Sequence, residues 1–285
     1  MRVLVTTDGS RYGKWALEWV GHLPLTEAPT VKVLHVVDIG SLRAPFMLQP
    51  AVIGTERYLK EEIVKVQAQA ERTKEEAARA LKSEGLTGRV VIERGPVAAT
   101  IVKAAKRGIG LMTVGSRGLD AVDRFMLGSV STHVIHHVSC SVLVVREAPR
   151  AIRRVVLAVD GSTASKRAMQ FLLRSMRPST GRASQGPIRV TVTHAMPFLN
   201  YPEVRQAGKA IVEECSAKLV RAGYVVEQVP TIGNPADNIL KTAEVHEADL
   251  IVSGAKGRGA VGRFLLGSVS TRLVQHAACS VLVVR

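Results

Sequence analysis

One series of motifs occurs twice in this chain, and this internal repeat restricts the possible folds more than any other feature. Asp160 follows Asp8 by 152 positions and Gly254 follows Gly115 by 139, in closely matching contexts. The matched segments are 3–10 and 155–162, 115–132 and 254–271, and 140–146 and 279–285. A unit of this length is the size of a domain rather than of a solenoid repeat. The sequence therefore predicts two tandem domains, residues 1–146 and 152–285, joined by a short linker at residues 147–151.

Each copy alternates short apolar runs with longer amphipathic stretches. In the first copy the expected strands cover residues 3–6, 31–37, 89–92, 111–114 and 142–145, and the expected helices cover 11–20, 56–84, 97–107 and 129–138. The strand segments are continuously rich in Val, Ile and Leu, which is typical of strands buried on both faces. Strands that alternate with helices predict a parallel, doubly wound α/β sheet with right-handed crossovers.

Composition excludes several classes of protein. The 285 residues are 46% apolar and 22% charged, which is typical of a globular chain with a sizeable core and excludes wholesale disorder. No apolar run approaches the ~18–20 residues of a membrane-spanning helix, and the N-terminus lacks a signal-peptide pattern. Three cysteines are too few for a disulfide framework. We therefore expect a cytoplasmic protein.

The chain is basic, with a net charge of +15 and a pI of about 10.2. The surplus is spread over both copies, +6 on residues 1–146 and +9 on residues 147–285, without a basic tail. Aromatic residues make up only 4% of the chain, which leaves few side chains for stacking on bases. Nucleic acid is therefore not expected as the main partner.

The polar and glycine-rich motifs fall where the predicted strands end. Asp8 and Asp160 end the first strand of each copy, and Gly115 and Gly254 end the fourth. Open parallel sheets bind ligands at the carboxyl ends of their strands, near the switch in strand order. Each glycine loop leads into a helix, and a helix N-terminus offers unpaired N–H groups and the positive end of the dipole. The motifs therefore predict a phosphate-binding site in each copy.

A purely structural explanation of the same motifs also exists. The glycines can simply form turns, and Ser129 and Ser268 can simply cap the helices that they begin. Recurrence of the same spacing in both copies favours ligand binding, although duplication also copies sites that later decay.

The motif Gly-x2-Gly-x9-Gly-Ser, at residues 115–129 and 254–268, occurs together with Asp-Gly-Ser after the first strand and Val-Leu-Val-Val at the end of each copy. In this combination the chain resembles the universal stress protein family in its tandem-domain form, over essentially its whole length. The resemblance implies, in each domain, a five-stranded parallel sheet flanked by about four helices, of the adenine nucleotide alpha-hydrolase-like, Rossmann-like type. It also implies binding of ATP, or of ADP or AMP, with Mg²⁺ or Mn²⁺ carried by the phosphates.

Carried over to this sequence, the family motif assigns nucleotide-binding residues in each copy and no catalytic residue. Asp8 is expected at the ribose or adenine end of the nucleotide, and the backbone of Val37 is expected beside the adenine. The first set is Thr6, Thr7, Asp8, Val37, Gly115, Ser116, Arg117, Gly118, Gly128, Ser129, Val130 and Ser131. The second set is Ala158, Val159, Asp160, Gly254, Ala255, Lys256, Gly257, Gly267, Ser268, Val269 and Ser270.

Two features near these sites allow more than one interpretation. At the expected adenine edge, the second copy has Ala195-Met196-Pro197 in place of Val36-Val37-Asp38, which puts that edge in question. Four basic residues near the glycine motifs can pair with phosphate or remain solvated loop charges. They are Arg117, Lys256, Arg258 and Arg263.

Histidine and cysteine residues near the end of each copy invite a comparison with metal sites. The first copy has His133, His136, His137 and Cys140 at metal-like spacing, but the repeat does not maintain the pattern, so no metal site is expected. Cys140 and its counterpart Cys279 begin the last strands, where they are expected as small buried apolar residues.

The terminal strands, residues 142–145 and 281–284, are expected at sheet edges, where unpaired backbone groups invite pairing. The resemblance implies that such strands pair antiparallel between two domains. A tandem chain can form this pair internally as a pseudo-dimer, and two such chains can dimerise again.

The sequence is compatible with three functions. The first is an ATP-binding stress-response switch with at most slow hydrolysis or autophosphorylation, acting through an unknown protein partner. The second is a true nucleotide hydrolase of the same superfamily. The third is a nucleotide-free basic scaffold whose binding depends steeply on salt.

Overall fold

The computed structural model describes residues 1–41, 55–106, 108–118, 127–179, 186–196, 202–257 and 266–285. In the first half, residues 1–146, the elements are β1 (Arg2–Thr6), α1 (Arg11–His22), β2 (Thr30–Val37), α3 (Thr55–Ser83), β3 (Thr87–Arg94), α4 (Val97–Ala105), β4 (Leu111–Gly115), α5 (Ser129–His137) and β5 (Ser141–Val145). In the second half, residues 152–285, they are β6 (Arg154–Ala158), α6 (Thr163–Ser175), β7 (Arg189–Met196), α7 (Pro202–Arg221), β8 (Val225–Ile232), α8 (Pro235–Val245), β9 (Leu250–Gly254), α9 (Ser268–His276) and β10 (Ser280–Val284).

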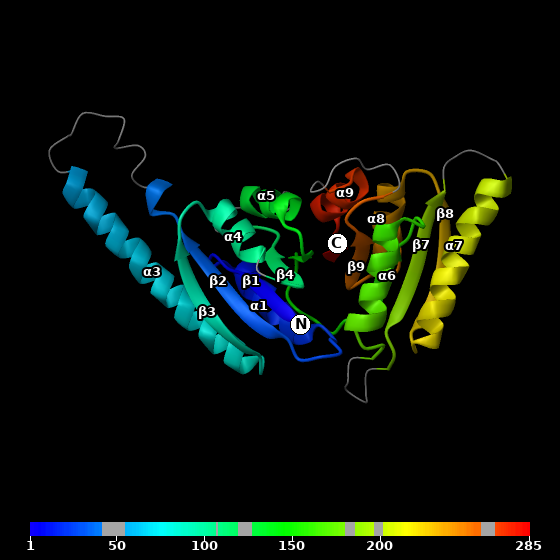
Figure 1. Cartoon of the computed structure of the whole chain (residues 1–285), viewed down its shortest axis with the longest axis horizontal. Helices are drawn as coiled ribbons and strands as arrows, with labels where there is room; N and C mark the ends of the chain where they lie inside the picture. Colours follow the sequence, from blue (N-terminus) through cyan, green and yellow to red (C-terminus); the bar gives the residue numbers. More distant parts are fainter. Residues whose placement is uncertain (42–54, 107, 119–126, 180–185, 197–201, 258–265) are drawn as a thin grey trace.

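The ten strands form one sheet in the order β3-β2-β1-β4-β5-β10-β9-β6-β7-β8. Within each half all neighbouring strands are parallel, and each half has the same internal order. The two halves meet at β5 and β10, which pair antiparallel with Leu143 opposite Leu282 and Val142 opposite Val283. We call this pair the seam; it joins the two halves that lie side by side in Figure 1.

Two hydrophobic clusters cover the two faces of this sheet, and both run across the seam. One packs α1, α3, α6 and α7 against the strands and includes Leu143 and Leu282. The other packs α4, α5, α8 and α9 against the opposite face and includes Val142 and Val283. Adjacent seam residues therefore enter opposite clusters, as the alternation of side chains along a strand requires. The halves share their cores as well as their sheet.

Two partly buried arginines at the ends of the seam strands reach from one half into the other. Arg146 Nη2 donates to the carbonyls of Val274 and, at 2.6 Å, Gln275 in the last turn of α9. Arg285 Nη2 donates in the same way to the carbonyl of Ile135 in α5. A cation stabilises a helix C-terminus because the last carbonyls lack partners and form the negative end of the dipole. Burial, followed by the charge of Arg117, lowers the pKa of Arg146 to about 10.

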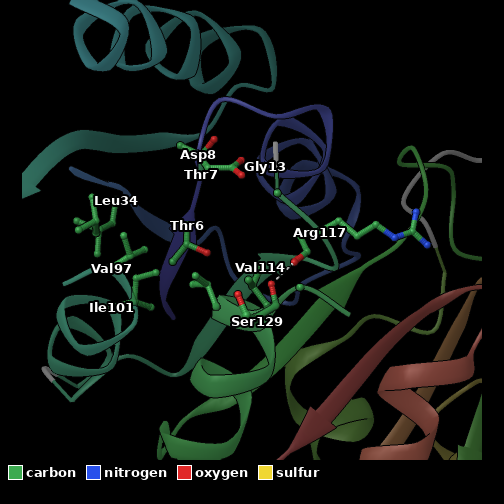
Figure 2. A pocket seen from close by; sticks show the side chains of 16 residues that line it. Thr6, Thr7, Asp8, Gly13, Leu34, Val97, Ile101, Val114, Arg117 and Ser129 are labelled. Carbon is green, nitrogen blue, oxygen red and sulfur yellow. Dashed lines mark hydrogen bonds between the residues drawn. The ribbon is translucent and has the colours of Figure 1, made fainter. Parts of the chain in front are cut away.

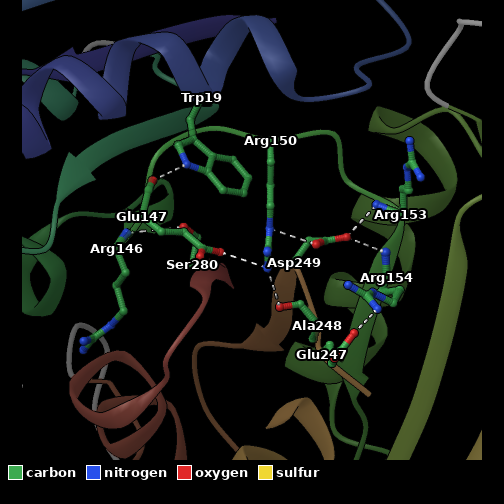
Figure 3. A network of polar contacts seen from close by, with 10 residues as sticks. All are labelled: Trp19, Arg146, Glu147, Arg150, Arg153, Arg154, Glu247, Ala248, Asp249 and Ser280. Carbon is green, nitrogen blue, oxygen red and sulfur yellow. Dashed lines mark hydrogen bonds and ion pairs between the residues drawn. The ribbon is translucent and has the colours of Figure 1, made fainter. Parts of the chain in front are cut away.

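A polar network near the linker also ties the halves together, as Figure 3 shows. Trp19 Nε1 donates to the Glu147 carbonyl at 2.9 Å. Arg150 lies 3.2 Å from the Glu147 carboxylate and 3.0 Å from that of Asp249, which is 3% exposed. The other oxygen of Asp249 accepts the N–H groups of residues 153 and 154, both at 2.8 Å. The buried carboxylate is thus fully engaged at the start of the second half.

The predicted fold class is confirmed. Each half has a five-stranded parallel sheet, and the described residues of each half include four helices with complete bounds. Every expected element of the first half is present, with ends shifted by a few residues; the helix expected to reach Arg107 ends at Ala105, and position 107 lies outside the described residues. Among the described helices, none has the length and apolar character needed to span a membrane.

Candidate functional site

A cavity of about 380 Å³ lies at the carboxyl ends of β1, β2 and β4 (Figure 2). We call it the first cavity. It is lined by Thr6, Thr7, Asp8, Gly13, Leu34, Val36, Val97, Ile101, Val114, Gly115, Arg117, Gly118, Gly128, Ser129, Val130 and Ser131. It lies beside the switch in strand order between β1 and β4, where open parallel sheets bind ligands. Its volume falls within the range of about 300–1,000 Å³ that is usual for small-molecule sites.

One end of the first cavity is apolar. Leu34 and Val36 contribute from β2, two positions apart and therefore on the same face of the strand. Val97 and Ile101 contribute from the start of α4, one helical turn apart. Figure 2 shows Leu34, Val97 and Ile101 grouped on one side. A flat, weakly polar ring can be buried between these side chains.

The N-terminus of α5 lies at the other end. The first N–H that bonds back along this helix belongs to Thr132, which donates to the Gly128 carbonyl at 2.9 Å. The N–H groups of Ser129, Val130 and Ser131 therefore lack helical partners. Gly128 is the N-cap and has no side chain to cap them. Because these residues line the cavity, the positive end of the helix dipole faces the cavity, where it would stabilise a bound anion.

Asp8 is held at the turn between β1 and α1. The Ser10 N–H donates to Asp8 Oδ1 at 2.9 Å. A Cβ added at Gly118 would lie only 2.6 Å from Asp8 Oδ2, so any larger residue there would displace this carboxylate from its present position. The second half repeats the arrangement, with Asp160 Oδ2 at 2.9 Å from a Cβ on Gly257. The second glycine of the motif is thus explained by the aspartate.

The first and third glycine positions of the motif differ in why a glycine is present. A Cβ at Gly115 would lie 2.8 Å from Tyr12 Cβ, and one at Gly254 would lie 2.5 Å from the Ala164 backbone. These two glycines let β4 and β9 pack closely against α1 and α6. A Cβ at Gly128 would meet no neighbour closer than 3.6 Å, which is ordinary contact. Protein packing therefore does not require glycine at position 128, whereas close approach of a ligand would.

The equivalent cavity of the second half, the second cavity, is much smaller, at about 120 Å³. It is lined by Ala158, Val159, Asp160, Ser165, Thr193, His194, Ala195, Pro235, Ile239, Ser253, Gly254, Lys256, Gly257, Val269 and Ser270. Strand register places Thr193 where the first half has Leu34, and the repeat places Ser253 where it has Val114. The second cavity is therefore smaller, and polar side chains stand in it where the first cavity has Leu34 and Val114.

Most of the residues expected at the sites line the two cavities, and a few do not. Val37 is buried outside the first cavity, and its carbonyl accepts the Gly95 N–H at 3.0 Å. Ser116 is 1% exposed and also lies outside the lining. Ala255, Gly267 and Ser268 are absent from the lining of the second cavity. Arg258 and Arg263 lie outside the described residues.

The side chain of Arg117 does not point into the first cavity. Figure 2 shows its guanidinium directed away from the cavity, while its backbone borders it. Arg117 Nη1 donates to the Tyr12 hydroxyl at 2.5 Å, and the guanidinium carbon lies 5.2 Å from the centre of the Tyr12 ring. In this arrangement Arg117 engages the first turn of α1 rather than a phosphate.

Comparison with known proteins assigns the family. The model of the universal stress protein family matches residues 1–146 and again residues 151–285. The chain belongs to the universal stress protein family. The two matches correspond to the two halves of the sheet, so this is a tandem member of the family.

Some relatives match the chain over its whole length, and others match one half of it. A universal stress protein of Mycolicibacterium smegmatis is 29% identical over 306 residues, covering 99% of this chain and 96% of the relative. A universal stress protein of Thermus aquaticus is 36% identical over 144 residues, which is 47% of this chain and 98% of that protein. The crystal structure of a universal stress protein from Archaeoglobus fulgidus DSM 4304 is 22% identical with a TM-score of 0.71, covering 100% of this chain and 98% of that one.

The apolar end of the first cavity was not predicted from the sequence. Leu34, Val36, Val97, Ile101 and Val114 line it, and none of them was expected to do so. A signal was present: a Val and an Ile one helical turn apart follow Gly95-Pro96, which marks the start of a helix after the third strand. These residue types are common in any core, so their contact with a cavity became evident only when the strands and α4 were placed together.

The described histidine and cysteine side chains near the ends of the two halves lie in ordinary packing positions. No group of three or more His, Cys, Asp or Glu side chains suited to a metal ion occurs among the described residues. The rings of His133 and His137 stack with centres 4.1 Å apart. Burial raises the pKa of the Cys140 thiol to about 11 and the pKa values of Cys215 and Cys279 to about 12. The cysteines are therefore core residues, as expected for positions 140 and 279.

This burial leads to a simple prediction for thiol reactivity. The native chain is expected to react very slowly with Ellman's reagent at pH 7.5, because the nucleophilic thiolate is scarce and the sulfurs are buried. Unfolding in guanidinium chloride should release all three thiols for rapid reaction. Rapid reaction of one thiol in the native chain would contradict the placement of that cysteine in the core.

Proposed function

We propose that this universal stress protein binds an adenine nucleotide, ATP in the first instance, in the first cavity. One observation carries the proposal: a single cavity of about 380 Å³ has apolar walls at one end and the uncapped N-terminus of α5 at the other. A nucleotide has the same polarity, with a flat base at one end and phosphates at the other. The family assignment supports the same proposal.

Each end of the first cavity contributes by a different physical effect. Leu34, Val97 and Ile101 would bury the faces of the base and exclude water from it. The Asp8 carboxylate would accept hydrogen bonds from ribose hydroxyls. The N–H groups of residues 129–131 would donate to the phosphate oxygens and, with the helix dipole, stabilise their negative charge. Mg²⁺ or Mn²⁺ bound by the phosphates would neutralise further charge there.

Binding without efficient turnover is the activity that this lining supports. Asp8 is the one carboxylate among the described lining residues, and the family motif assigns it to the sugar end of the nucleotide rather than to the terminal phosphate. An efficient hydrolase positions a group that orients the attacking water in line with the leaving phosphate. We therefore propose a nucleotide-dependent stress-response switch in the cytoplasm, whose partner protein responds to occupancy of the first cavity.

The difference between the two cavities gives the stoichiometry. Titration of Mg-ATP into nucleotide-free protein is expected to show about one site per chain, because the second cavity of about 120 Å³ is below the usual size of a small-molecule site. Isothermal titration calorimetry measures this number directly. Acid release and chromatography of the nucleotide that copurifies should give the same ratio and identify it as ATP, ADP or AMP.

The other outcomes distinguish the alternatives. Two sites per chain would show that the second cavity opens to accept a nucleotide, contrary to the proposal. No binding in either assay would leave the basic scaffold as the better description. Steady release of phosphate over many turnovers, lost in Ser129→Ala, would instead favour the nucleotide hydrolase.

A further inference from the structure

Five exposed arginines lie at one edge of the second half. Arg153 precedes β6, Arg174 is in the last turn of α6, Arg177 follows that helix, Arg189 begins β7 and Arg221 ends α7. The amino ends of parallel strands and the carboxyl ends of their crossover helices share one edge of a doubly wound sheet. This edge, which we call the basic edge, is therefore opposite the cavities at the carboxyl ends of the strands.

Backbone contacts join these five positions into one region. The Arg189 N–H donates to the Arg153 carbonyl at 2.8 Å. The residue before Arg189 donates its N–H to the carbonyl of Pro178, next to Arg177, at 2.6 Å. A Cβ added to Gly223, two residues after Arg221, would lie 3.3 Å from the Pro178 side chain. The arginines thus project from neighbouring segments.

Within the described ranges, the guanidinium groups of these five arginines lack acidic partners. No ion pair joins any of the five to a carboxylate in the part of the chain that the structure describes. Arg177 donates to the backbone carbonyl of Thr26 at 3.1 Å, which leaves its charge uncompensated. Arg154, beside them, pairs with Glu247 at 2.5 Å and is not counted in the basic edge. Five positive charges therefore face solvent together.

The repeat shows that the basic edge is particular to the second half. Strand register pairs Thr30 with Arg2 in the first half and Arg189 with Arg154 in the second, so Arg189 corresponds to Thr30. Arg221 ends α7 as Ser83 ends α3. In order, the first-half counterparts of the five arginines are Met1, His22, Leu25, Thr30 and Ser83. The fold does not require arginine at these positions, because the first half builds the same elements without it.

We propose that the basic edge binds the phosphodiester backbone of duplex nucleic acid. Arginine offers a planar, always charged fork that matches phosphate oxygens, and all five residues are arginine. Aromatic side chains near these arginines turn inward: Phe171, one turn before Arg174, packs against the hydrophobic cluster, and Tyr224 is 4% exposed and donates its hydroxyl to the Leu172 carbonyl at 2.9 Å. Contact with the backbone of a duplex is therefore favoured over stacking on single-stranded bases. The inference does not depend on nucleotide binding in the first cavity.

The test is the salt dependence of binding to a fluorescently labelled DNA duplex of mixed sequence, followed by anisotropy in the absence of nucleotide. Five phosphate contacts predict a slope of log K against log salt concentration of about −4.5, since each contact contributes about −0.9. The triple variant Arg153→Gln, Arg189→Gln, Arg221→Gln is expected to reduce the slope to about −1.8. These side chains are exposed, and an unchanged melting temperature and Mg-ATP titration would verify the fold.

The matched control removes three charges elsewhere. Lys60→Gln, Lys103→Gln, Lys106→Gln changes the net charge equally at exposed positions of the first half, and should leave the slope near the wild-type value. An equal loss in both triple variants would show that net charge alone drives binding and would overturn the proposal. The proposal would also be overturned if the protein did not bind the duplex. Binding only to vesicles rich in anionic lipid, or only to a single-stranded oligonucleotide, would identify a different partner.

Discussion

Mg-ATP is expected to bind the Gly128→Val variant at least about 100-fold more weakly than the wild-type chain, a loss of about 2.7 kcal/mol. The fold accepts a Cβ at this position, because its nearest neighbour is 3.6 Å away, and the backbone is extended, with φ −61° and ψ 150°, as β-branched residues prefer. Its methyl groups would occupy the space in front of the α5 N-terminus where phosphates are proposed to lie. Calorimetric titration measures the effect.

Gly267→Val is the matched control, because Gly267 caps α9 as Gly128 caps α5, with φ −68° and ψ 158°. Each change costs about 1 kcal/mol or less in helix capping, so both variants should melt slightly and equally below the wild type. Only the first-half variant should lose the nucleotide. Unchanged affinity in Gly128→Val would refute phosphate binding at α5, and a loss in Gly267→Val alone would place the site in the second half.

Val283→Glu is expected to destabilise the chain by about 4 kcal/mol or more. Val283 is 0% exposed, lies opposite Val142 in the seam, and belongs to a hydrophobic cluster that continues into both halves. A buried carboxylate without a partner is one of the few changes that cost this much. Urea denaturation followed by circular dichroism gives the free energy of unfolding, and binding of the dye ANS reports exposed apolar surface.

The control for this experiment is Val225→Glu. Val225 begins β8, an outer strand of the sheet, and is 42% exposed, so the same substitution should cost about 0.5 kcal/mol or less. Equal denaturation midpoints for the two variants, with unchanged sedimentation, would show that the seam does not hold the halves together.

The sequence predicted the architecture well because its signals are local or repeated. Continuous Val, Ile and Leu runs marked β4 and β5 within one residue, and the recurrence of the glycine motif revealed two halves of one type. Helix ends were less accurate, since α4 stops two residues before the expected position 107. Fraying and local hydrogen bonds decide such ends, and periodicity does not report them.

The candidate site was predicted at its glycine-rich end and missed at its apolar end. Gly118 and Gly128 belong to a motif that recurs at the same strand end in both copies and resembles the family motif, so the sequence could propose them. Leu34 and Ile101 look like core residues in the sequence, and their contact with one cavity depends on how β2 and α4 pack. For the second cavity, the intact glycine motif predicted a site, while Ala195-Met196-Pro197 put its adenine edge in question; its small volume depends on packing that the sequence does not show.

The seam has a consequence for how such a protein can diverge. In a symmetric dimer of single-domain chains, every substitution appears in both subunits, so a change that suits one site is imposed on the other. Here β5 and β10 pair within one chain, so equivalent positions in the two halves can hold different residues. Leu34 in the first half corresponds to Thr193 in the second, and Thr30 corresponds to Arg189. Covalent duplication thus frees two equivalent surfaces to specialise while a common core keeps them together.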